Sequence, residues 1–404
     1  MMLKTLLLAA TLTLVGMGRP GPAGAMEDKY WVGDSSWWDY EENWDPPGQP
    51  HNFDTVYLVQ NDAVDRTVWY YNSEYPDEWI SLLTIDASGP GTMTFEMTPT
   101  DAHPLKANSI TVGGEHVGIL EQYAGDVTVS NVLKIGDFTT STGTYAMSGG
   151  SLSAADMHVG YDGEGALHIT DASADITVSQ MLGFGPKGTF TAVPGTVIHM
   201  TGSAFVNEGS DEGSLAGLGN VELIFEGGAG DVDPFEVAGE DRGAVVAGLF
   251  GNFAVGGLTL GGVDIGQVVL AEGFDNSPGP DVQYVKYLSV GAGSTLDLNG
   301  QTFYYGVLLD GAGAIIGGAP VRVDRWGDAD MNGVVDGLDL TAVLSNWDAA
   351  DPVADLDGNG VVDGLDLTAV INNWSAAGGA VPEPATVLLV ALGGAAAIRR
   401  RRQR

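Results

Sequence analysis

The chain contains no cysteine and few basic residues: 16 lysines and arginines stand against 53 aspartates and glutamates in 404 residues. The absence of cysteine excludes disulfide bonds, so buried apolar surface and bound metal ions must supply stability. The formal net charge of −37 at pH 7 repels other polyanions. We therefore expect no nucleic acid and no acidic polysaccharide as partner, whereas a neutral polysaccharide is compatible with such a surface.

Recognisable catalytic motifs are lacking as well. The sequence has no His-Glu-x-x-His motif, no P-loop, no Gly-x-Ser-x-Gly motif and no cysteine nucleophile. The segment Gly183–Gly188 matches Gly-x-Gly-x-x-Gly, but strand-forming residues follow it where a helix should begin, which indicates a repeat turn. The six histidines show no ligand-like spacing: His51, His103, His116, His158, His168 and His199. We therefore predict no catalytic residues and a non-catalytic protein.

Enzymes that degrade polysaccharides are the main alternative. Two carboxylates across a cleft suffice for a glycoside hydrolase, but 53 acidic residues in one sequence do not single out a pair. Polysaccharide lyases with a solenoid fold rely on basic residues, and Lys134 and Lys187 are the only ones between Val112 and Asp241. The sequence therefore disfavours a lyase and leaves a glycoside hydrolase as the enzyme alternative.

The N-terminus has the pattern of a targeting segment. Residues 1–25 combine Lys4, an apolar run from Leu6 to Val15, and the small-residue site Ala23-Gly24-Ala25, which is typical of a cleaved signal peptide. The apolar run is too short for a transmembrane anchor. We therefore expect an exported protein that begins at Met26.

The C-terminal segment, residues 377–404, has a second targeting pattern. Val381-Pro382-Glu383-Pro384 precedes an apolar run from Ala385 to Ile398 and the basic cluster Arg399–Arg402. A helix of this run spans about 21 Å, less than the roughly 30 Å hydrocarbon core, which favours a transient sorting signal over a permanent transmembrane helix. An ordinary stop-transfer anchor is the alternative.

This tail resembles the PEP-CTERM sorting tail in all three of its parts. The resemblance implies processing by an exosortase-type enzyme and a transient contact with the membrane through the C-terminal hydrophobic helix. It also implies a location at the cell surface or in the extracellular matrix of a Gram-negative-type bacterium.

Residues 108–320 repeat with a nearly fixed period. Short apolar stretches end at glycines spaced 23, 24 and 23 residues apart, and a second glycine series runs in phase with them: Gly113, Gly136, Gly160 and Gly183, then Gly118, Gly143, Gly165 and Gly188. Such a period, with alternating apolar residues and glycine turns, predicts the stacked coils of a parallel β-solenoid. Phrases such as Ser-Gly-Gly-Ser-Leu resemble the autotransporter-like β-helix bodies of PEP-CTERM surface proteins. The chain is therefore predicted to be mainly β.

Residues 26–107 are rich in aromatic side chains: Trp31, Trp37, Trp38, Tyr40, Trp44, Trp69, Tyr70, Tyr71, Tyr75 and Trp79. Aromatic faces suit the stacking of sugar rings, which would make this region the binding surface of a glycan-binding adhesin. Alternatively, these residues form a β cap that covers the open end of the solenoid. We favour the cap.

Residues 321–376 contain a duplicated acidic loop. Calcium takes six to eight oxygen ligands, and a twelve-residue loop supplies them from positions 1, 3, 5, 7, 9 and 12, with glycine at position 6. Two loops 27 residues apart follow this pattern. The predicted ligands are Asp328, Asp330, Asn332, Val334, Asp336 and Asp339, then Asp355, Asp357, Asn359, Val361, Asp363 and Asp366, the two valines through their carbonyl oxygens. The sequence therefore predicts two bound Ca²⁺ ions, weakened by aspartate where position 12 is commonly glutamate.

Each loop is followed by a pattern typical of one short amphipathic helix. The offsets 0, 3, 4 and 7 carry apolar residues in both copies: Leu340, Val343, Leu344 and Trp347, then Leu367, Val370, Ile371 and Trp374. Because neither stripe is covered alone, we expect the two loop-helix units to pack against each other.

Residues 328–374 resemble a type I dockerin, a module of two calcium loops that are each followed by one helix. The resemblance implies docking to a cohesin module on another protein. Positions that carry hydroxyl residues in many dockerins are Gly337-Leu338 and Gly364-Leu365 here, so calcium binding carries over and the cohesin partner does not. We hypothesise that the module docks the solenoid to a cohesin-like or other surface protein.

Overall fold

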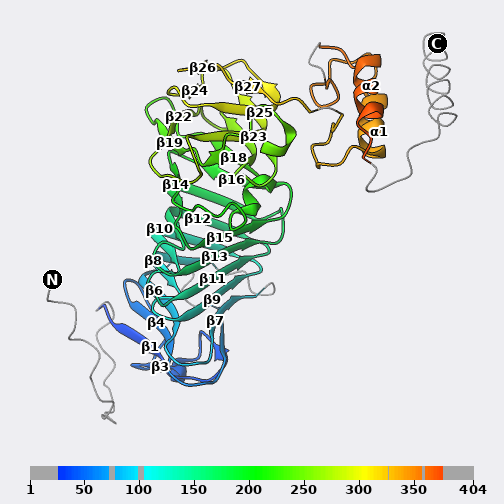
Figure 1. The fold of residues 1–404 in the computed structure, drawn as a ribbon. Coiled ribbons are helices and arrows are strands. Elements are labelled where there is room, and N and C mark those ends of the chain that lie inside the picture. Colours follow the sequence, from blue (N-terminus) through cyan, green and yellow to red (C-terminus); the bar gives the residue numbers. More distant parts are fainter. Residues whose placement is uncertain (1–25, 72–77, 99–103, 326, 357–359, 376–404) are drawn as a thin grey trace, which may run out of the picture.

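The computed structural model describes residues 26–71, 78–98, 104–325, 327–356 and 360–375. These residues form a long stack of short strands, and two short helices lie beside the C-terminal end of the stack (Figure 1). The predictions of a mainly β chain and of a β-solenoid are confirmed. The expected signal peptide and C-terminal hydrophobic helix lie outside the described residues, and no helix within them is long and apolar enough to cross a membrane.

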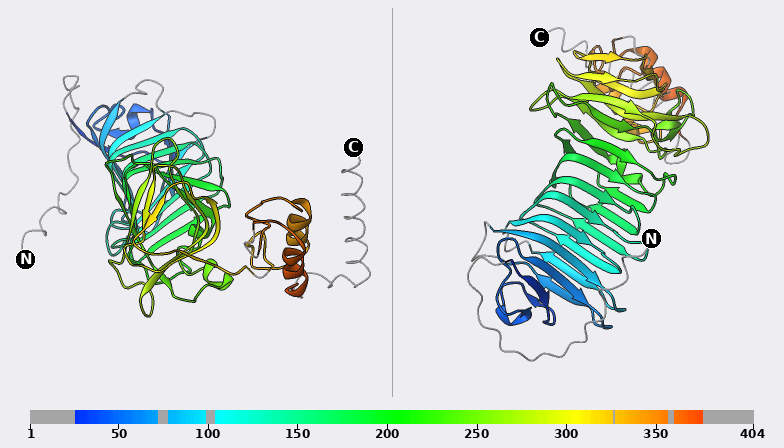
Figure 2. Two further views of the ribbon diagram at one scale, coloured as in Figure 1. Left: turned by 90° about the horizontal axis from the view of Figure 1, so that it is seen from above. Right: turned by 90° about the vertical axis from the view of Figure 1, so that its left-hand side faces the viewer.

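Two sheets form the walls of the stack, and nearly all of their strands pair in parallel (Figure 2). The smaller sheet has seven strands: β2 (Ser36–Trp37), β5 (Arg66–Trp69), β7 (Met93–Met97), β9 (Val117–Gln122), β11 (Thr142–Met147), β13 (Glu164–Ile169) and β15 (Gly188–Ala192). The larger sheet begins with β1 (Asp28–Trp31), β3 (Trp44–Asp45), β4 (Thr55–Gln60), β6 (Trp79–Ala87), β8 (Leu105–Val112), β10 (Asp126–Ile135), β12 (Ser151–Val159) and β14 (Asp175–Phe184).

The C-terminal half of the stack belongs to the larger sheet, which has twenty strands in all. Its remaining strands are β16 (Thr196–Met200), β17 (Ala204–Asn207), β18 (Val221–Phe225), β19 (Asp233–Glu236), β20 (Gly239–Glu240), β21 (Val255–Leu260), β22 (Gln267–Ala271), β23 (Asp281–Val290), β24 (Thr295–Asp297), β25 (Phe303–Asp310), β26 (Ala314–Ile316) and β27 (Val321–Arg322). The described part of the chain also has three short 3₁₀ helices: η1 (Glu41–Asn43), η2 (Ala216–Asn220) and η3 (Val246–Leu249).

Inward-facing side chains of successive coils stack in rows. In the smaller sheet the strand register places Leu120, Tyr145, Leu167 and Phe190 side by side, and each is 0% exposed. Burying a side chain of this size stabilises the fold by about 1.5–3 kcal/mol. A single coil would leave such a row open on both sides, so each coil depends on its neighbours.

The in-phase glycine series keeps its predicted register. Gly143 pairs with Gly118 and with Gly165, which pairs with Gly188. A Cβ atom on Gly165 would collide with the backbone of the neighbouring coil at the carbonyl oxygen of Ile135, so only glycine fits this close approach.

The other glycine series holds for three of its four members. Gly113, Gly136 and Gly160 have positive φ angles of 69°, 75° and 70° and end the strands of the larger sheet. The fourth equivalent position is Gly185, whose N–H bonds the carbonyl oxygen of Val159, whereas the predicted Gly183 lies within β14 opposite His158. The prediction of Gly183 was wrong by two residues, and a bulge at which β14 carries one residue more than β12 accounts for one of them.

Strands on both sides of residue 108 belong to the same stack, because β4 pairs in parallel with β6 and β6 with β8.

Large aromatic side chains fill the N-terminal end of the stack. Trp38 and Trp44 are each 1% exposed, with ring centroids 4.8 Å apart, and Trp38 also contacts Phe95 edge to face at 5.7 Å. Trp38 is therefore a core residue, inaccessible to a sugar.

One acidic side chain, Asp233 on β19, points into the interior of the solenoid. Asp233 is 2% exposed, and its Oδ2 atom accepts no hydrogen bond from the residues that the structure describes. Burial, together with the charge of Asp231, raises the pKa of Asp233 from 3.8 to about 7. The folded solenoid therefore holds this carboxyl in a site that favours the protonated form.

This raised pKa makes the stability of the solenoid depend on pH. Protonated Asp233 stabilises the fold below pH 3.8, and this contribution is lost as the pH rises toward about 7. The pKa difference corresponds to at most about 4 kcal/mol. We expect the variant Asp233→Asn to be more stable than the unsubstituted chain at pH 8 and to gain little at pH 4. Urea unfolding at both pH values, with the exposed Asp175→Asn variant as control, measures this. An equal gain in stability at both pH values would contradict the prediction.

Candidate metal centre

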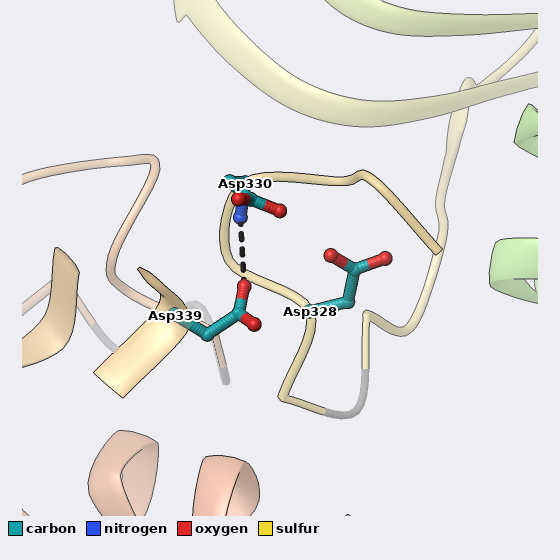
Figure 3. A group of neighbouring side chains, drawn as sticks. All are labelled: Asp328, Asp330 and Asp339. Carbon is teal, nitrogen blue, oxygen red and sulfur yellow. Dashed lines mark hydrogen bonds between the residues drawn. The ribbon is translucent and has the colours of Figure 1, made fainter. Parts of the chain in front are cut away.

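Three carboxylates of the first acidic loop converge on one point. One oxygen each of Asp328, Asp330 and Asp339 lies within 4.8 Å of the others (Figure 3). Asp328 and Asp339 are buried, with exposures of 3% and 0%, and Asp330 is half-buried. The structure thus brings together positions 1, 3 and 12 of the predicted loop.

Backbone groups fold the loop around these carboxylates. Asp328 accepts hydrogen bonds from the backbone N–H groups of Asn332 (3.1 Å) and Gly333 (2.9 Å). Asn332, at position 5, donates from Nδ2 to Asp330 (2.9 Å) and accepts from the N–H of Val334 (2.8 Å), the residue at position 7. Gly333 at position 6 has a φ of +84°, which explains the predicted need for glycine at the turn.

The last two ligand positions also start the helix that follows. Helix α1 (Gly337–Ser345) begins after Asp336, and the carboxylates of Asp336 and Asp339 form a reciprocal capping box with the backbone. Asp339 additionally accepts the N–H groups of Ala329 (2.7 Å) and Asp330 (3.1 Å). Asp339 therefore ties the beginning of the loop to the beginning of the helix, a role that the sequence pattern alone did not reveal.

The second loop has the same construction in its described part. Helix α2 (Gly364–Asn372) is capped by Asp363 and Asp366, and Asp366 accepts the N–H of Leu356 (2.6 Å). The N–H of Gly360 bonds Asp355 at 2.9 Å, as Gly333 bonds Asp328. Val361 is 45% exposed, while the predicted ligands Asp357 and Asn359 lie outside the described residues.

The electrostatics of the first loop suit a cation. Burial raises the pKa of Asp328 to about 6, and the charges of Asp339 and Asp330 add to this effect. Burial also raises the pKa of Asp330. Carboxylates this close repel one another, and a divalent ion between them would relieve that repulsion. The donor atoms are all oxygens, which is the set that Ca²⁺ prefers, so the residues present fit calcium.

The apolar stripes behind the loops meet in a core of their own. Val343 and Val370 are 0% exposed, and the cluster includes the partly buried Leu340, Leu367, Trp347 and Trp374. The prediction was wrong in two details. Both tryptophans lie beyond the helix ends, and Leu344 and Ile371 do not belong to this cluster. The helices end two residues before these tryptophans, with Asn346 and Asn373 as their C-caps.

The first loop also packs on the solenoid. Met331, at loop position 4, is 2% exposed in a cluster with Leu249, Tyr284 and Val307 of the last coils. The solenoid and the loop module therefore share a buried contact. The sequence analysis did not predict this contact. The apolar residue Met331 inside an otherwise polar loop is the feature that could have indicated it.

A buried arginine joins the two loops. Arg325 is 1% exposed and donates to the carbonyl oxygens of Val353 (2.6 Å), Pro352 (3.1 Å) and Asp355 (2.8 Å). The guanidinium thereby fixes the segment that leads into the second loop. Sequence reasoning did not single out Arg325, although it is one of the few basic residues next to a strongly acidic segment.

Comparison with known proteins identifies the C-terminal tail. Residues 380–402, which lie outside the described residues, match the family model of the PEP-CTERM protein-sorting motif. No curated protein and no solved structure is significantly similar to the chain. The motif marks an exported cell-surface protein of a Gram-negative-type bacterium that an exosortase processes. The predicted sorting signal and exosortase processing are therefore confirmed.

Proposed function

We propose that this surface-sorted protein uses residues 321–376 as a dockerin-like calcium module that docks the β-solenoid to another protein of the cell surface. The observation that carries the proposal is the convergence of Asp328, Asp330 and Asp339 in a loop whose construction recurs 27 residues later. Exosortase sorting brings the chain to a compartment where calcium is abundant enough to fill weak sites.

Each loop would hold one Ca²⁺ ion through six residues. The ligands of the first ion are Asp328, Asp330, Asn332, Val334, Asp336 and Asp339, and those of the second are Asp355, Asp357, Asn359, Val361, Asp363 and Asp366. Calcium would neutralise the crowded carboxylates and fix the two loops. Because Asp339 and Asp366 also cap α1 and α2, the bound ion would stabilise the helices and the core between them.

The exposed starts of the two helices are the surface that we assign to the partner. Leu338 and Leu365 occupy equivalent positions and are 63% and 61% exposed. Two large apolar side chains at equivalent exposed positions favour a protein partner with an apolar contact surface. A cohesin-like module is one partner of this kind.

A pull-down from envelope extract of the source organism tests the proposal. The full chain is used as bait in calcium and in chelator, beside the variants Leu338→Asp plus Leu365→Asp and Asp328→Ala plus Asp355→Ala. We expect one partner that is retained only in calcium and is lost at least tenfold with either double variant. Calcium binding by the chain is measured in parallel by calorimetry. Absence of calcium binding, or a partner retained equally in chelator, would contradict the proposal.

A further inference from the structure

A row of outward-facing side chains at the N-terminal end of the smaller sheet differs from the rest of that face. The register pairs Trp37 of β2 with Trp69 of β5. It then pairs Trp69 with Glu96 of β7, and Glu96 with Glu121 of β9. All four side chains are partly exposed, although Trp38 next to Trp37 is buried. The row therefore presents two indole rings followed by two carboxylates along the stack.

The aromatic half of the row is a small platform. The ring centroids of Trp37 and Trp69 lie 5.8 Å apart, and Tyr71 stands edge-on to Trp37 at 6.4 Å. Tyr71 follows Trp69 by two residues on the same face of the chain. Three rings on neighbouring coils thus lie together on the outside of the solenoid.

The carboxylate half is held in place by this platform and by one exposed tyrosine. The indole Nε1 of Trp69 donates to Oε2 of Glu96 at 3.1 Å. The hydroxyl of Tyr123, which is 42% exposed, donates to Oε2 of Glu121 at 3.2 Å. A carboxylate offers about four acceptor sites, so both glutamates retain acceptors for a ligand.

The solenoid itself does not require indole rings at these positions. Farther along the same row, Ala146 of β11 and His168 of β13 pair in equivalent places, and the coils stack equally well. Large rings that the interior does not need, grouped on one face, mark a binding surface more often than a structural one. The buried Trp38 and Trp44 already fill the end of the core.

We propose that this row is a binding site for a neutral glycan chain lying along the solenoid axis. The apolar faces of sugar rings stack on Trp37 and Trp69, and sugar hydroxyl groups donate to Glu96 and Glu121. Neighbouring strands are about 4.8 Å apart, so successive sugar units meet successive coils. The two carboxylates and the net charge of −37 exclude anionic polysaccharides and nucleic acids.

Retention of the full chain on insoluble neutral polysaccharides tests this site. The probes are amorphous cellulose, β-1,3-glucan, mannan and amylose, with alginate as an anionic comparison. We expect retention on at least one neutral polymer and none on alginate. Trp37→Ala plus Trp69→Ala should reduce retention at least tenfold, and Glu96→Gln plus Glu121→Gln should reduce it several-fold.

Matched controls separate binding from folding. Trp79→Ala removes a partly exposed tryptophan from β6 of the other sheet and should leave retention unchanged. Trp37→Phe plus Trp69→Phe keeps aromatic faces and should restore most of the retention if the alanine variant misfolds. Retention should be equal in calcium and in chelator, which distinguishes this site from the calcium module. Lack of retention on every neutral polymer, equal loss with Trp79→Ala, or loss in chelator would overturn the proposal.

Discussion

Replacing Asp339 and Asp366 together by alanine is expected to unfold the module of residues 321–376 at every calcium concentration. Both carboxylates are 0% exposed. Asp339 accepts three backbone N–H groups, from Ala329, Asp330 and Asp336, and its loss would leave the N–H of Ala329 buried and the other two part-buried without this acceptor. Leaving one such donor unsatisfied costs about 1–3 kcal/mol. The two sites together would lose more than the stability of about 5 kcal/mol that a domain of this size has.

Limited proteolysis of the full chain measures this effect, because the solenoid should survive while the module is cut. The matched control is Asp330→Ala, which removes a proposed ligand from the half-buried third position of the same loop. We expect this control to weaken calcium binding in the first loop but to keep the module resistant in calcium. Persistence of both helices by circular dichroism in the Asp339 and Asp366 double variant would refute the role assigned to these carboxylates.

The stacked coils of the β-solenoid were predictable because the apolar residues that hold them together recur with a regular period in the sequence. Leu120 is buried because Tyr145 and Leu167 of the following coils stack beside it. Each coil needs such a neighbour, so the apolar residues recur at a regular spacing in the sequence. A regular spacing does not reveal where a strand carries an extra residue at a bulge. The equivalent glycine is Gly185 and not Gly183, and the one extra residue at the bulge in β14 accounts for one of these two positions.

The candidate metal centre was predictable from ligand spacing because consecutive residues supply its ligands. The carboxylates of Asp328 and Asp339 converge as the loop pattern requires. Contacts between distant segments were not predictable. Met331 is an apolar residue inside an acidic loop, and only the fold shows that it packs against Leu249 and Tyr284. Arg325 likewise acts on residues 27 to 30 positions away.

The variant Arg325→Ala is expected to destabilise the module by about 3 kcal/mol or more. It would remove three hydrogen bonds from a fully buried guanidinium and leave carbonyl oxygens of Pro352, Val353 and Asp355 without these donors. Asp355 begins the second loop, so its carboxylate would lose its fixed position. We expect the calcium concentration that half-saturates this loop to rise at least tenfold. Arg325→Lys should recover little, because one ammonium group cannot bond three separated carbonyl groups as a planar guanidinium does.

Calcium titration and thermal unfolding of the full chain test this prediction against Arg322→Ala. Arg322 is half-buried and donates one bond to the carbonyl oxygen of Asp355 at 2.7 Å, so its loss should cost about 1 kcal/mol. The difference between the two variants isolates the effect of burial, because both remove a positive charge from the same acidic neighbourhood. Equal losses for Arg322→Ala and Arg325→Ala would show that net charge, and not the buried hydrogen bonds, holds the two loops together.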